Sequence, residues 1–243
     1  MVRLSTLALF LSALSVLPAS PAVAGAPGPA APPQTAIRDT ARQGDASSHP
    51  GVPPALERLE SAAEDIGDAV ANGQWEKANT LVQAAARDLD AVPQKEGSAV
   101  LRARGHLDEA RKAIESRRSL DAQFAANALS GDVLDLYAGY QPVVPIEVMR
   151  LDVLLRRVQL VGLAGRPKDA SAPLRETRTI WVQLRDQAPL ASTPAARRFE
   201  CELDAVEQAS GAKDAKKLAR AAGAALEGVD ALEKEYERER PSR

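Results

Sequence analysis

The chain has 243 residues, of which 26% are charged, and its 31 basic and 33 acidic side chains give a net charge of −2. This balance leaves no cationic surplus of the kind that neutralises nucleic-acid phosphates, so we expect no nucleic-acid partner. Cys201 is the only cysteine, which excludes an internal disulfide. We expect Cys201 to be partly buried as a small apolar side chain, and pairing between chains stays open.

Residues 1–24 have the pattern of a cleaved export signal. Arg3 precedes an apolar stretch from Leu4 to Leu17, and small residues follow at Ala22 and Ala24. The stretch is shorter than the roughly 20 residues that a membrane-spanning helix needs. We therefore expect cleavage after Ala24, a periplasmic or secreted protein, and no transmembrane helix after signal cleavage.

Residues 25–52 are rich in proline and glycine and poor in bulky apolar side chains. Such a segment cannot bury enough surface to offset the entropy lost on ordering. The sequence predicts a disordered linker at residues 25–52, followed by an all-helical domain at residues 53–240.

From residue 53 onward, apolar residues recur with the 3.6-residue period of amphipathic helices. The first two stripes cover residues 56–70 and 75–89, and Ser98 is expected to cap a third helix. Whether residues 98–138 form one helix or two stays open, because residues 116–119 and 130–132 are both weak points.

The stretch Ile146–Leu163 is apolar around most of its circumference, which predicts a helix in the middle of a bundle with Leu154 in its core. Pro173 delays the start of the next regular helix to about Ser171. Thr193 is the expected cap of a helix that opens with proline. The last stripe, residues 218–236, has heptad spacing.

No window alternates in the manner of a strand, so the predicted fold is all-α: an antiparallel helical bundle or a short array of helical hairpins. A faint repeat relates Gly73–Ala78 to Gly165–Ala170, with Gly211–Ala215 as a shorter relative. This segment resembles the inter-helix turn of tetratricopeptide repeats, with Trp75 at the aromatic position and Ala78 at the small one. The copies are not 34 residues apart, so the resemblance is confined to the turn.

Sequence signatures of common enzymes and cofactor sites are absent, including nucleophile elbows, phosphate loops, dinucleotide loops, HExxH and CxxCH. The only histidines are His49 and His106, and we interpret His106, beside Asp108 and Glu109, as part of a solvated helix face. We therefore expect no enzyme, no cofactor and no metal site.

The segment from residue 127 to 181 offers the best candidate binding residues. Two tyrosines stand beside prolines, an acid and an arginine are one turn apart in the most apolar helix, and a tryptophan and an arginine are one turn apart further on. Such residues would wall a pocket for an acidic ligand or peptide, or would be ordinary bundle core. The candidates are Tyr137, Tyr140, Asp152, Arg156, Trp181 and Arg185.

Two functions follow as expectations. The first is a non-enzymatic interaction or scaffold module of the cell envelope, with another envelope protein as its partner. The alternative is a carrier of a small ligand or metal ion in a pocket around Tyr137, Tyr140, Arg156 and Trp181. A homo-oligomer remains open.

Overall fold

The structure is a computed structural model that describes residues 51–93 and 97–239. The predicted signal peptide, and the predicted linker up to residue 50, lie outside the described residues. The chain divides into two units, Met1–Asp45 and Ala46–Arg243, and all described residues belong to the second.

All regular structure in the described ranges is helical, which confirms the all-α class. None of these helices combines the length and apolarity needed to cross a membrane. In chain order the helices are α1 (Pro54–Ala71), α2 (Trp75–Ala91), α3 (Ser98–Glu115), α4 (Ser119–Leu136), α5 (Ile146–Leu163), the short 3₁₀ helix η1 (Pro167–Ala170), α6 (Ser171–Leu184), α7 (Pro194–Gly211) and α8 (Ala215–Arg238).

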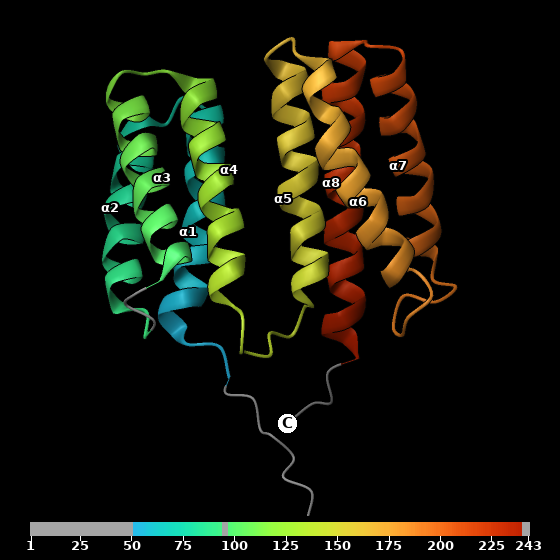
Figure 1. The fold of residues 1–243 in the computed structure, drawn as a ribbon, viewed down its shortest axis with the longest axis horizontal. Coiled ribbons are helices and arrows are strands. Elements are labelled where there is room, and N and C mark those ends of the chain that lie inside the picture. The colour runs from blue at the N-terminus through green and yellow to red at the C-terminus, as the bar shows by residue number, and fades with distance from the viewer. Residues whose placement is uncertain (1–50, 94–96, 240–243) are drawn as a thin grey trace, which may run out of the picture. The chain divides into compact units, whose positions relative to one another are not determined.

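The helices form two antiparallel four-helix bundles, α1–α4 and α5–α8, which meet where α4 contacts α5 (Figure 1). Each bundle has an apolar core of its own. Some side chains cross the boundary: Phe124 of α4 packs against the second core, and Ile146 and Met149 of α5 pack against the first. This exchange joins the bundles by apolar contacts in addition to the connecting loop.

The four helical hairpins share one turn geometry. The residues with positive φ are Gly73 (68°), Arg117 (51°), Gly165 (70°) and Lys213 (55°). In each turn the next N–H donates to a carbonyl five residues earlier, as in Gln74 N to Ala69 O at 2.8 Å. This is the hydrogen bond of a Schellman cap, which satisfies the free carbonyls at a helix end.

These turns recur at near-constant spacing. Gly73 and Arg117 are 44 residues apart, and 48 residues separate each later pair of successive turns. The residue five positions after each turn is fully buried: Ala78, Ala122, Ala170 and Leu218. A repeat of one hairpin therefore exists, but the sequence alignment through Gly211 was wrong, because Gly211 still belongs to α7 and Lys213 takes the turn position.

The structure also settles several helix boundaries. Residues 98–138 form two helices, broken at the first weak point and continuous through the second. The prediction that Ser98 caps α3 was wrong, because Gly97 is the cap residue and no side chain bonds there. The starts at Ser171 and Pro194 are confirmed, and the Thr193 hydroxyl accepts from Ala196 N at 3.0 Å.

Two predicted burials were wrong. Cys201 lies exposed on α7. Leu154 is only half-buried and lines a surface groove, whereas its neighbour Leu155 is fully buried in the second core. Helix α5 is apolar nearly all round because one face packs into its own bundle and the opposite face meets α4.

Candidate functional site

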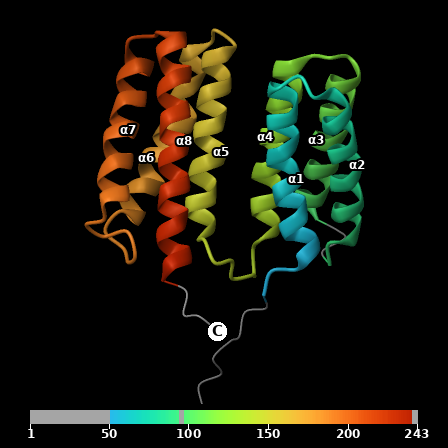
Figure 2. The same cartoon turned by 180° about the vertical axis from the view of Figure 1, so that it is seen from behind.

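A cluster of carboxylates lies along the boundary between the bundles, on the side where α1 and α8 are seen in Figure 2. We call it the acidic face. Its members are Glu57, Glu60, Glu64 and Asp68 of α1, Asp152 of α5, and Asp230, Glu233 and Glu237 of α8.

Helical spacing explains why these carboxylates gather. The four on α1 follow one another at steps of three, four and four residues, and the three on α8 at steps of three and four. Residues at such steps share one face of a helix. Because α1 and α8 both border the boundary, the two acidic stripes lie close together: the charge of Glu233 raises the pKa of Glu64, and the charge of Glu60 raises the pKa of Glu233.

The crowding makes these carboxyls hold their protons more tightly. Burial first, and then the charges of Glu60 and Asp152, raise the pKa of Glu64 to about 8. Burial and the charges of Asp152 and Asp230 raise the pKa of Glu233 to about 7. Solvent reaches Glu64 at the edge of the boundary and screens part of this repulsion. The acidic face is therefore electrostatically strained when all its carboxyls are ionised.

Two cavities open on this face. The larger, of about 660 Å³, is lined by the glutamates at 57, 60, 233 and 237 and by Tyr137, and among residues 51–93 and 97–239 no lysine or arginine lines it. Tyr137 is 3% exposed, and burial together with the charges of Glu60 and Glu57 raises the pKa of its hydroxyl. The smaller cavity, of about 200 Å³, is lined by Glu64, Asp152 and Arg156 among others.

Arg156 is the basic side chain of the smaller cavity. Its guanidinium lies 3.5 Å from Asp68 of α1 and 3.9 Å from Asp152, one turn away on its own helix. The Asp152 carboxylate is 16% exposed, and burial raises its pKa even though Arg156 acts in the opposite direction. Asp152 and Arg156 are thus neighbours, as their spacing in the sequence predicts. Arg156 also contacts Asp68 of α1, and the pKa values of the surrounding carboxyls stay raised.

The six sequence-predicted residues do not meet in one pocket. Tyr137 belongs to the first core and Tyr140 packs against it. Asp152 and Arg156 line the smaller cavity. Trp181 is buried in the second core.

The contacts of Trp181 and Arg185 are structural. The Trp181 indole N–H donates to the Glu200 carboxylate, and its ring meets Phe199 edge-on at 4.7 Å. The guanidinium of Arg185 lies 3.5 Å from the same Glu200 carboxylate. Arg178 adds a hydrogen bond of 2.5 Å to Glu200, so this carboxylate joins α6 to α7.

The sequence interpretation missed the glutamates of the acidic face, because acids on an amphipathic helix are usually solvated surface. The available signal was their regular spacing on the first and last helices of the domain. Within residues 51–93 and 97–239, no three acidic, histidine or cysteine side chains are placed to hold a metal ion.

Comparison with known proteins identifies no relative of this chain. No family model, no curated protein and no solved structure matches this chain significantly.

Proposed function

We propose that the protein is an exported, non-enzymatic interaction module of the cell envelope, which holds a lysine- or arginine-rich segment of another envelope protein against its acidic face. One observation carries the proposal: glutamates of α1 and α8 line a cavity of about 660 Å³, and no lysine or arginine from the part of the chain that the structure describes lines it with them.

The electrostatics favour a cationic occupant. Carboxylates packed this closely repel one another, and a cation between them would offset the repulsion that raises their pKa values. The partner's positive charges would also speed the encounter at low salt.

The shape of the acidic face favours a chain of charges over a single ion. The stripe on α1 runs from Glu57 to Asp68, which corresponds to about 16 Å of helix at 1.5 Å per residue. A peptide with several basic side chains can place one charge opposite each turn of α1, whereas a compact ligand reaches only part of the stripe.

The alternative of a small-ligand carrier rests on the smaller cavity. Its volume of about 200 Å³ and its lining by Glu64, Asp152 and Arg156 fit a small organic amine. A linear polyamine such as spermidine is the probe that separates the two functions.

Fluorescence anisotropy with a labelled eight-lysine peptide tests the proposal. At low ionic strength and pH 8 we expect binding that weakens steeply with salt. The double variant Glu60→Gln/Glu233→Gln should weaken binding about tenfold or more. The matched control Glu76→Gln/Glu176→Gln, with the same charge change on exposed positions of α2 and α6, should bind like wild type.

Two results would contradict the interaction module. Equal losses in both double variants would show attraction by net charge alone. Spermidine binding that survives when the peptide does not bind would favour the carrier.

A further inference from the structure

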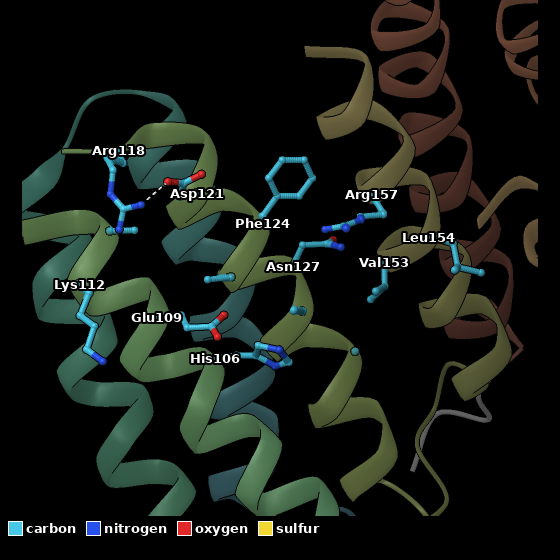
Figure 3. A pocket seen from close by; sticks show the side chains of 14 residues that line it. His106, Glu109, Lys112, Arg118, Asp121, Phe124, Asn127, Val153, Leu154 and Arg157 are labelled. Atoms are coloured by element: carbon cyan, nitrogen blue, oxygen red, sulfur yellow. Dashed lines mark hydrogen bonds and ion pairs between the residues drawn. The ribbon is translucent and has the colours of Figure 1, made fainter. Parts of the chain in front are cut away.

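A second, chemically different groove lies on the other side of the α4–α5 contact (Figure 3). It has a volume of about 660 Å³ and lies between α3, α4 and α5. Ala125, Ala128 and Gly131 of α4 line it, and their small side chains leave the space open. The volume is within the range of small-molecule sites.

His106 is held in this groove by a buried carboxylate. Its Nδ1 lies 2.6 Å from Oδ2 of Asp132, a residue that is 6% exposed. The other oxygen of Asp132 accepts from Arg102 Nε at 2.7 Å. Because a carboxylate only accepts, Nδ1 is the donor and Nε2 of His106 is left free for a ligand. The buried carboxylate therefore fixes both the orientation and the tautomer of the ring.

Arg157 of α5 supplies positive charge at one end of the groove, and Lys112 of α3 also lines the groove. Its guanidinium lies over the ring of Phe124, 4.5 Å from the centroid, and Arg166 lies over the same ring at 5.3 Å. Burial and the charge of Arg166 lower the pKa of Arg157. No carboxylate of the described residues lies within ion-pair distance of Arg157, whereas Arg166 has Asp169 at 3.6 Å. In Figure 3, Asn127 extends toward Arg157 from the facing helix.

The remaining charged side chains make the two ends of the groove electrostatically different. Asp121 is paired with Arg118 at 2.5 Å, so it adds little negative charge. Glu109 lies beside His106 and would repel an anion at that end (Figure 3). The end near Arg157, Asn127 and Phe124 is therefore the more favourable for negative charge.

We propose that this groove binds a small organic anion whose carboxylate or phosphate group is held by Arg157 and Asn127, and a hydroxyl of which donates to Nε2 of His106. Asn127 also lines the smaller cavity of the acidic face, but the groove involves none of the carboxylates of that face.

Isothermal titration of the purified protein tests this site with citrate, inorganic phosphate and phenyl phosphate as separate probes. Citrate binding alone would assign a carboxylate ligand, and phosphate-ester binding alone would assign a phosphate ligand. Arg157→Gln should weaken the binding of the active probe about tenfold, because a charge-assisted hydrogen bond is lost. His106→Gln should weaken it less, and Glu109→Gln should tighten it.

The control is Arg220→Gln, which removes the same charge from an exposed position of α8 outside the groove and should bind like wild type. Circular dichroism and a thermal melt of each variant show whether it is folded. The proposal is overturned if none of the three probes binds at 10 mM, or if folded Arg157→Gln binds as tightly as wild type. Weaker binding in Glu109→Gln would also overturn it, because that result requires a cationic ligand group.

Discussion

At the scale of single residues, neighbouring leucines of α5 have opposite roles. Leu155 is fully buried in the second core, whereas Leu154 is half-buried and lines the groove of Figure 3. Leu155→Ala should lower the free energy of unfolding by about 2–5 kcal/mol, and Leu154→Ala by about 1 kcal/mol or less. Urea denaturation of both variants measures this. Equal costs would place the two side chains in one core.

Asp152 gives a second prediction, because the sequence left open whether Asp152 and Arg156 form a buried ion pair or line a pocket. An acid beside an arginine in an apolar helix suggests a buried ion pair, whose disruption costs several kcal/mol. Here Arg156 is 3.9 Å away, while burial and the charges of Asp230 and Asp68 oppose ionisation of Asp152. The free energy of unfolding of Asp152→Asn should therefore be within about 1 kcal/mol of the wild-type value at pH 7. At pH 9 it should be somewhat higher than that of wild type. A large loss of stability of this variant at both pH values would show that the ion pair between Asp152 and Arg156 is the dominant contact.

At the scale of helices, the closest crossing joins α5 to α8. A Cβ added at Gly162 would lie 2.8 Å from Ala219 N and 3.0 Å from Ala215 O, both backbone atoms that cannot move aside cheaply. Gly162→Ala should therefore cost about 1–3 kcal/mol. The matched control is Gly105→Ala on exposed α3, where nothing lies within 4 Å and helix propensity predicts a gain of about 0.5–1 kcal/mol. Melting temperatures that move in the same direction for both would show that the crossing is looser than described.

The hairpin turns show how far local sequence reaches. Gly73 and Gly165 marked two turns, because glycine adopts positive φ without steric cost. Arg117 and Lys213 take the same conformation against their own preference, so neither residue type marks its turn position, although residues 116–119 were recognised as a weak point. Packing of the flanking helices decides those turns, and a single-residue pattern does not contain that information.

The boundary between the two bundles could not be predicted from the sequence, for a similar reason. Periodicity located the apolar stripe of each helix, and nearly all its members are buried. Periodicity does not show which helices are neighbours. A single bundle of all the helices and two four-helix bundles would both produce the same apolar stripes. Asp132 illustrates the consequence: it looked like part of a weak point in a helix, yet it is the buried partner of His106, 26 residues away.

At the scale of the whole domain, the α4–α5 contact separates two proposed binding surfaces of opposite character. The acidic face is built by α1 and α8 with Asp152 of α5, and the groove near Arg157 is built by α3, α4 and α5. Both use the boundary between bundles, where helices are held in place by two separate cores. A cation on one side and an anion on the other would each be held by rigid helices, and the two sites share no lining glutamate.

The acidic face also sets the pH dependence of stability. The carboxyls of Glu64 and Glu233 have folded-state pKa values of about 8 and about 7, above the ordinary 4.5. Between pH 4.5 and pH 8, the folded state therefore binds more protons than the unfolded state. The stabilisation is fully present below pH 4.5 and is lost as the pH rises through 7 and 8. The melting temperature should accordingly fall between pH 5 and pH 9.

Glu233→Gln isolates this contribution, because glutamine keeps the shape of the side chain without titrating. Its melting temperature should fall less steeply over the same range, with a gain over wild type on the order of 1 kcal/mol at pH 9 after solvent screening is allowed for. Glu76→Gln on exposed α2 should follow the wild-type curve. Melts at half-unit pH steps compare the three proteins. Parallel curves for wild type and Glu233→Gln would mean that α1 and α8 do not crowd their carboxylates, and the electrostatic basis of the proposed interaction would be lost with them.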